Sequence, residues 1–327
     1  MQLDVPVVVR KGAAYVPHDF VNQVFQSSLD KTFVVERVPN PLNPLTEAEI
    51  QATLEVLKAS GRHKAGLRFT EISVKRPPKD EVWNFALTGQ PVRAPRQAAF
   101  VALDGKKVIE GTVDLAARTL TAWKPIEGAH GMVLLDDFAT VQSAIEASPD
   151  YAKALATRGI ADVKKVVATP LTVGYFDGKD SLRQEDRLLK VVSYLDVGDG
   201  NYWAHPIEGL VAVVDLEQKK VIKIEDGGLV PVPLKPTPYD GRDRAATPAP
   251  KPLEITEPEG KNYTITGHTM HWRNWDFHVR LDSRVGLVLS TVTYNDKGTK
   301  RKVMYEGSLG GMIVPYGDPD VGWYFKA

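Results

Sequence analysis

An internal repeat is the feature that most constrains the fold. Residues 113–115 read Val-Asp-Leu and recur at 214–216, an offset of 101 residues. Each copy is followed by a polar turn and another strand-like run, and each is preceded by a helical segment. A three-residue match is weak alone, but the shared order of elements supports it. The repeat therefore predicts an α+β chain with two tandem domains, each a helix packed on an antiparallel sheet.

The first copy has clear signals for its helix and strands. Thr46 and Glu49 have the spacing of a capping box, and apolar residues on one face lead to a stop at Ser60 and Gly61. Alternating strands are expected over 67–74, 98–103, 107–115 and 119–123, with Asp104 and Gly105 as the first hairpin turn.

The second copy repeats this order. A helix is expected from about Asp137 to Gly159, and strands over 164–173, 188–195, 209–216 and 220–224. Residues 1–36, with two short strands and a helix, are too few for an independent core. They are expected to be the end of a preceding stalk-like domain.

A proline-rich segment divides the repeats from an all-β region. Seven prolines lie between residues 231 and 252, a composition that favours extended backbone. The predicted organisation is the stalk-like end at 1–36, α+β domains at 37–128 and 129–230, a linker at 231–253, and the start of a large antiparallel β-sandwich at 254–327. Residues 323–327 read as the middle of a strand, so we expect a longer polypeptide.

Composition excludes some partners and leaves the compartment open. Lys plus Arg and Asp plus Glu both number 41, so no net charge attracts nucleic acid or an anionic membrane. No apolar run approaches the roughly 20 residues that span a bilayer. Without cysteine the chain has no disulfide and no thiol nucleophile, which is compatible with both cytosol and periplasm.

Three histidines invite a metal hypothesis that strand geometry argues against. His268, His271 and His278 lie within eleven residues. Side chains alternate along a strand, so His268 and His271 point to opposite faces. His268 and His278 share a face, but only a fold-back of the chain would let them meet one ion. Surface or hydrogen-bonded imidazoles are the favoured interpretation.

Two carboxylate pairs also have simple structural explanations. Asp136 and Asp137 sit where a helix is expected to begin, so capping and the helix dipole account for them. Asp240 and Asp243 alternate with arginines in the linker, which indicates a solvated charge cluster.

No local motif supplies a nucleophile or a phosphate loop, but one tyrosine is unusually constrained. Residues 307–311 lack the glycine order of a nucleophile elbow around Ser308. Residues 314–319, VPYGDP, place Tyr316 between two prolines beside an apolar run. Such rigidity suits a site residue, although spacing alone favours a structural tyrosine.

A family resemblance changes the interpretation of Tyr316. The runs 272–277, 286–289, 292–294, 301–305 and 312–319 resemble, in order, the opening of the catalytic domain of copper-containing primary amine oxidases. The whole chain is similar to the N-terminal portion of the bacterial tyramine/phenylethylamine oxidase branch. That similarity implies two cystatin-like α/β domains, a linker and the first strands of the large β-sandwich.

The resemblance also implies a reaction and its parts. Members deaminate primary amines oxidatively with copper and topaquinone, giving aldehyde, ammonia and hydrogen peroxide. It implies a homodimer, a periplasmic location, and a role for Tyr316 as both the catalytic and the cofactor-binding residue, through its hydrogen bond to the quinone. The proton-abstracting aspartate, the cofactor tyrosine and the copper histidines of the family would lie beyond Ala327.

Two functions therefore stand beside each other. The leading expectation is a copper amine oxidase of which this chain is one part, inactive when alone. The alternative is a non-catalytic structural or protein-interaction module in which the α+β domains mediate contacts.

Overall fold

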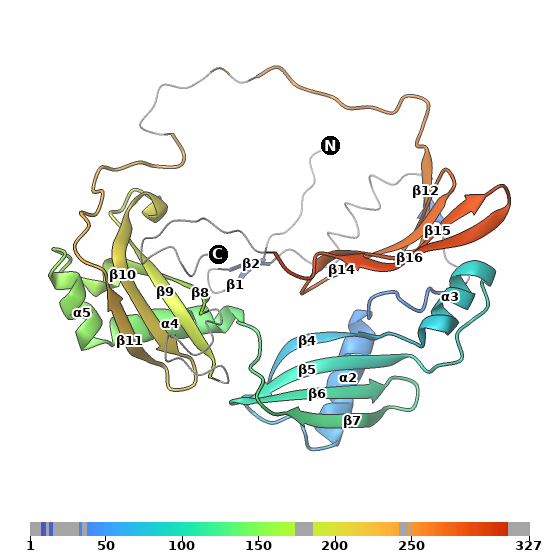
Figure 1. Ribbon diagram of the computed structural model, residues 1–327, viewed down its shortest axis with the longest axis horizontal. Helices are drawn as coiled ribbons and strands as arrows, with labels where there is room; N and C mark the ends of the chain where they lie inside the picture. Colours follow the sequence, from blue (N-terminus) through green and yellow to red (C-terminus); the bar gives the residue numbers. More distant parts are fainter. Residues whose placement is uncertain are drawn as a thin grey trace.

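The computed structural model describes residues 8–10, 13–15, 33–34, 38–173, 186–241, 248 and 250–312. Within them, three larger antiparallel units follow one another along the chain (Figure 1). We call α2 to β7 the first domain, α4 to β11 the second domain, and β12 to β16 with β3 the C-terminal sheet. The α+β class predicted from the repeat is confirmed.

The first domain is a four-stranded sheet with a helix against one face. Its elements are α2 (Glu47–Ala59), β4 (Arg68–Lys75), α3 (Lys79–Thr88), β5 (Gln97–Asp104), β6 (Lys107–Asp114) and β7 (Thr119–Ile126), with strand order β4-β5-β6-β7. The capping box of Thr46 and Glu49 is present. Leu57 of α2 is buried in a cluster with Phe100 and Val113 of the sheet. The short α3 was not predicted from the sequence.

The second domain has the same plan, with one correction. It contains α4 (Leu135–Glu146), α5 (Pro149–Ala156), η1 (Val163–Lys165), β8 (Val166–Thr172), β9 (Leu188–Leu195), η2 (Tyr202–Ala204), β10 (Pro206–Asp215) and β11 (Lys220–Asp226). The single helix predicted to reach Gly159 is wrong. Ser148 accepts a hydrogen bond from the Tyr151 N–H and Pro149 occupies the first turn, so a second helix begins there.

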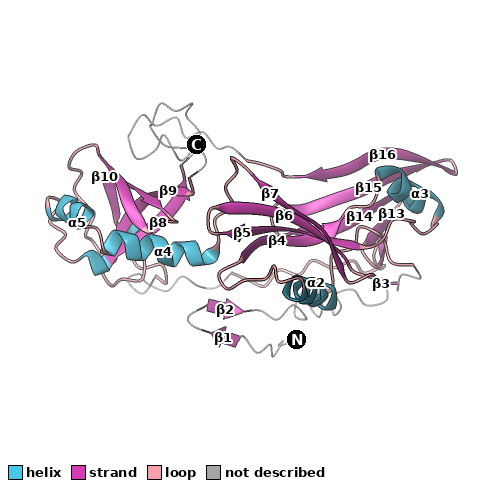
Figure 2. Cartoon of the chain, turned by 90° about the horizontal axis from the view of Figure 1, so that it is seen from below, coloured by secondary structure: helices cyan, strands magenta, loops and turns pink. Residues whose placement is uncertain are grey.

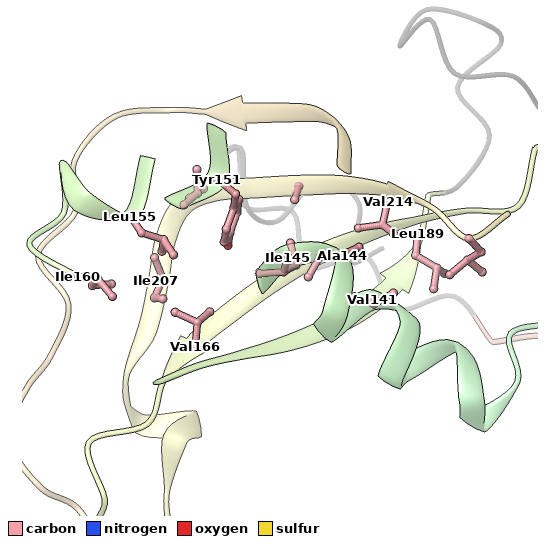
Figure 3. Packing of buried hydrophobic residues seen from close by; sticks show 14 residues of the cluster. Val141, Ala144, Ile145, Tyr151, Leu155, Ile160, Val166, Leu189, Ile207 and Val214 are labelled. Atoms are coloured by element: carbon pink, nitrogen blue, oxygen red, sulfur yellow. The ribbon is translucent and has the colours of Figure 1, made fainter. Parts of the chain in front are cut away.

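The second core is built from both helices and the sheet (Figure 3). Val141, Ile145, Tyr151 and Leu155 project from the helices and meet side chains from the strands, among them Val166, Leu189, Ile207 and Val214. The Tyr151 hydroxyl donates to Ser193 Oγ at 2.8 Å. The buried hydroxyl of Tyr151 is thus paired within the core.

The repeat is visible in atomic detail. Asp114 accepts the N–H groups of the residues two and three positions after it, and Asp215 does the same 101 residues later. Arg118 and Lys219, also 101 apart, both take positive φ, at 53° and 55°. Register shifts fall at equivalent positions of β6 with β7 and β10 with β11. The two turns therefore share one conformation, not only three residues.

The C-terminal sheet is a meander with one added strand. β12 (Tyr263–Thr266), β13 (Thr269–Trp272), β14 (Trp275–Asp282), β15 (Gly286–Asp296) and β16 (Thr299–Ser308) pair antiparallel, and β3 (Phe33–Val34) pairs parallel with β12. β1 (Val8–Arg10) and β2 (Ala13–Tyr15) form a separate hairpin. The helix predicted within residues 1–36 lies outside the described residues.

The first domain contacts both of its neighbours (Figure 2). Arg68 of β4 pairs with Asp137 of α4 at 2.9 Å. On the other side Arg76 pairs with Glu306 of β16 at 2.9 Å, and the Trp83 ring of α3 lies 5.8 Å from that of Tyr305. The segment from β11 to β12 runs from the second domain to the C-terminal sheet (Figure 1).

Candidate functional site

Tyr316, the residue singled out by the sequence, lies outside the described residues. The structure describes the strands that lead to it: β15 and β16 pair along most of their length, and the chain leaves β16 at Ser308. The C-terminal sheet therefore contains the described residues that precede Tyr316 in the chain.

The chain does fold back between His268 and His278, as a contact between these two residues requires. The β13–β14 hairpin pairs Thr269 with His278, which brings the rings of His268 and His278 to 5.8 Å between centroids. His271 is occupied elsewhere, because its Nδ1 lies 2.8 Å from Asp276 Oδ1. The three imidazoles do not converge on one point.

His278 is a buried neutral histidine. It is fully buried, and its Nε2 lies 3.0 Å from Asn43 Oδ1. Burial, with smaller contributions from His268 and Arg280, lowers the pKa of His278 to about 3. Because an amide oxygen only accepts, Nε2 carries the proton and donates to Asn43. This bond ties the C-terminal sheet to the segment before α2.

The described residues do not fit copper. Among them, no three His, Cys, Asp or Glu side chains are grouped so that they could hold a metal ion. A copper site of the kind that the resemblance implies needs such a group. No step of chemistry is therefore derived through a metal held by these strands.

A pocket lies between the first domain and the C-terminal sheet. It encloses about 390 Å³, counting space open to solvent, and is lined by Asn40, Phe85, Ala86, Thr269, His271, Asp276, Phe277, Thr291, Thr293 and Lys300. Lys300 Nζ lies 2.6 Å from Asp276 Oδ2. The hydrogen bond from His271 and the bond from Lys300 outweigh burial and lower the pKa of Asp276 to about 2. This carboxylate is thus ionised and doubly paired, a structural ion cluster and not a general base.

One of the two carboxylate pairs has a larger structural role than the sequence predicted. Asp137 does accept the Leu134 N–H in the first turn of α4, as predicted. It is also 2% exposed and bonded to Arg68 and to Arg187, whose Nη2 lies 2.5 Å away. Arg187 is equally buried. This buried network was not predicted from the sequence. Asp240 is exposed, and Asp243 lies outside the described residues.

A second buried pair was also missed. His205 Nε2 lies 2.9 Å from Asp199 Oδ2, and both side chains are almost inaccessible. The residues stand six apart on either side of η2 and belong to no motif, so only the folded chain reveals them.

Comparison with families of known domains covers most of the chain. Residues 40–126 match the copper amine oxidase N2 domain, residues 136–244 the N3 domain, and residues 264–327 the copper amine oxidase enzyme domain. The N2 and N3 matches correspond to the first and second domains, and the third match contains Tyr316.

Curated relatives agree. Over its whole length the chain is 67% identical to a primary amine oxidase of Klebsiella aerogenes, of which it spans 43%. It is 35% identical over 287 residues to a primary amine oxidase of Arthrobacter sp. (strain P1), with 86% of this chain and 43% of the relative aligned. The chain thus spans less than half the length of these relatives.

A solved structure supports the fold. A copper-containing benzylamine oxidase from Hansenula polymorpha superposes with a TM-score of 0.70 at 21% identity, covering 88% of this chain and 47% of that one. With three domain matches in the family's order and a 67% identical relative, the chain belongs to the copper amine oxidase family and carries its N2 and N3 domains and part of its enzyme domain.

Proposed function

We propose that the protein to which this chain belongs is a copper/topaquinone primary-amine oxidase, which converts primary amines and oxygen to aldehyde, ammonia and hydrogen peroxide. The observation that carries the proposal is the 67% identity to the Klebsiella aerogenes primary amine oxidase over every residue of this chain. Such identity extends over both α+β domains and into the enzyme-domain match.

Tyr316 is the residue of this chain that we assign to the reaction. It lies inside the enzyme-domain match, in the run VPYGDP. A phenol O–H there donates to a quinone oxygen that gains charge as the ring is reduced.

Copper and topaquinone are assigned to residues other than those described here. The chain by itself is then a scaffold with one cofactor-contacting residue. We propose that it has no oxidase turnover alone.

The test is peroxide release by the 327-residue chain. Purified chain is supplied with copper(II), oxygen and a primary amine such as tyramine or phenylethylamine, and peroxide is measured by a coupled peroxidase assay. The proposal expects no amine-dependent peroxide. Turnover that requires amine and disappears in a chelator would overturn the assignment of the cofactors to other residues.

Homodimer formation and a periplasmic location complete the proposal. Both are expected from the bacterial branch that the sequence resembles, and the lack of cysteine is compatible with the second. Among the described residues, no helix is both long and apolar enough to cross a bilayer. Sedimentation of the complete protein and fractionation of its cells test the two expectations separately.

A further inference from the structure

His205 is positioned as a two-way hydrogen-bond donor. Its Nδ1 lies 2.5 Å from the carbonyl oxygen of Pro233 and its Nε2 lies 2.9 Å from Asp199 Oδ2. The ring is fully buried. A carbonyl oxygen and a carboxylate are both acceptors, so each ring nitrogen must present a hydrogen. An imidazole with hydrogens on both nitrogens is charged.

The Asp199 carboxylate beside His205 is ionised, so it has no hydrogen to donate to the ring. Asp199 Oδ2 also accepts the N–H of Thr237 at 2.7 Å, and Oδ1 accepts the N–H of Asn201 at 2.9 Å. These backbone donors, with His205, bring the pKa of Asp199 down to about 2. A neutral His205 would place a nitrogen lone pair against one of its two oxygen acceptors.

The same bonds hold the start of the proline-rich segment. We call residues 231–238 the strap. Pro233 accepts from His205, Thr237 donates to Asp199, and the Thr237 carbonyl accepts from Asn201 Nδ2 at 2.6 Å. Val232 adds apolar contact with the second core. Leu234, by contrast, is 64% exposed, and the strap contains no helix or strand.

We propose that His205 is a buried imidazolium that, with Asp199, fastens the strap to the second domain and releases it when the proton is lost. We call His205 and Asp199 the latch. The strap begins the connection to the C-terminal sheet, so the latch fixes the direction in which the chain leaves the second domain (Figure 1). Without the charge, one of the two hydrogen bonds of His205 is replaced by a repulsive contact, which weakens the polar attachment of the strap.

The pH dependence follows from the charges around the ring. Burial alone would lower the pKa of His205, but hydrogen bonds to Asp199 and Pro233 and the charges of Asp199 and Asp196 outweigh it, so the pKa lies above 6.5. Lys235, on the strap itself, is exposed. The attachment is complete below 6.5 and is lost as pH rises through the folded-state pKa of His205. On the acid side it is lost as pH falls toward 2, where Asp199 takes a proton.

The test follows His205 and the Thr237 amide in the same 327-residue chain. Histidine-selective ¹⁵N NMR between pH 5 and 10 reports the protonation of both ring nitrogens. Hydrogen exchange, corrected for the intrinsic rate, reports the Thr237 N–H. We expect His205 to stay doubly protonated above pH 6.5 and Thr237 protection to fall as that proton is lost.

A pair of variants separates the latch from general stability. His205→Gln keeps a polar side chain but removes the charge and the two N–H donors on opposite sides of the ring. The control is His130→Gln, which changes an exposed histidine. At pH 6, His205→Gln should speed Thr237 exchange by about tenfold or more, since bonds to charged groups are lost. The Val213 amide, in β10, should be unaffected, and His130→Gln should change neither amide.

Two results would overturn the proposal. One is a His205 that titrates at or below its ordinary pKa while Thr237 stays protected. The other is Thr237 exchange that is the same in His205→Gln as in the unaltered chain. If His205→Gln does not fold, the titration of the unaltered chain decides alone.

Discussion

Arg68 of β4 and Asp137 of α4 form a 2.9 Å ion pair that joins the first domain to the second. Asp137 also accepts from the buried Arg187, which reaches Glu217 at 3.1 Å with its other terminal nitrogen. The Asp137 carboxylate is therefore shared between the helix start, the core of its own domain and the neighbouring domain. Removing it leaves Arg187 with less compensation for its burial.

Asp137→Asn should destabilise the chain strongly. Loss of the buried negative charge weakens both arginine contacts, and we expect the free energy of unfolding to fall by about 3 kcal/mol. Urea unfolding measures the change. Asp136→Asn is the matched control, because the Asp136 side chain is 64% exposed and its bond to Arg68 should contribute about 1 kcal/mol or less. Equal losses in the two variants would contradict the assignment.

Gly111→Ala should disturb the first core. A Cβ at Gly111 would lie 2.0 Å from Phe100 Cζ, so the ring must move within a packed cluster. We expect a loss of about 1–3 kcal/mol. Gly310→Ala is the control, since no atom lies within 4 Å of its Cβ position and its φ is not positive. Thermal unfolding compares the two, and an unchanged transition in Gly111→Ala would refute the packing.

Tyr151 should make the second domain sensitive to alkali. Burial outweighs the hydrogen bond to Ser193 and raises the pKa of Tyr151 from 10.0 to about 12. Because the folded state favours the neutral phenol, stability is present below pH 10 and is lost as pH rises toward 12. Urea unfolding at pH 9 and 11 measures the loss. Tyr151→Phe should show a smaller difference between the two pH values, and an equal one would count against the burial of an intact phenol.

Copper should not be retained by the histidines of the C-terminal sheet. His271 is paired with Asp276 and His278 with Asn43, so neither is arranged for a shared ion. After copper(II) addition and dialysis against a weak chelator, metal analysis should find well under one copper per chain. His271→Ala should give the same value. One retained copper that His271→Ala removes would show that these residues form a site after all.

The parts of the fold that depend on local chemistry were predictable. The capping box at Thr46 and the shared turn after Asp114 and Asp215 are each determined by residues close together in the sequence. Both appear in the structure. The break at Ser148 was equally local, yet helical periodicity on both sides of it concealed the stop. The α3 helix was missed, although Pro78 directly precedes its first residue.

The polar networks could not be predicted, because their members meet only in three dimensions. Arg68 and Asp137 stand 69 residues apart, and Thr237 reaches Asp199 across 38 residues. No spacing rule links such residues. The strand-parity argument does not apply to His268, which lies in the turn between β12 and β13, and only the observed hairpin shows that His268 approaches His278. The role of Tyr316 stays a prediction, since that residue is not among those described.

The most direct test of the account is a chimera with the Klebsiella aerogenes primary amine oxidase. This chain replaces the 43% of that enzyme with which it aligns. With copper supplied, we predict quinone formation and amine-dependent peroxide release, and a kcat about tenfold lower for Tyr316→Phe, as one lost hydrogen bond implies. A folded chimera that binds copper yet releases no peroxide with any primary amine, while the Klebsiella enzyme does, would contradict the proposed function.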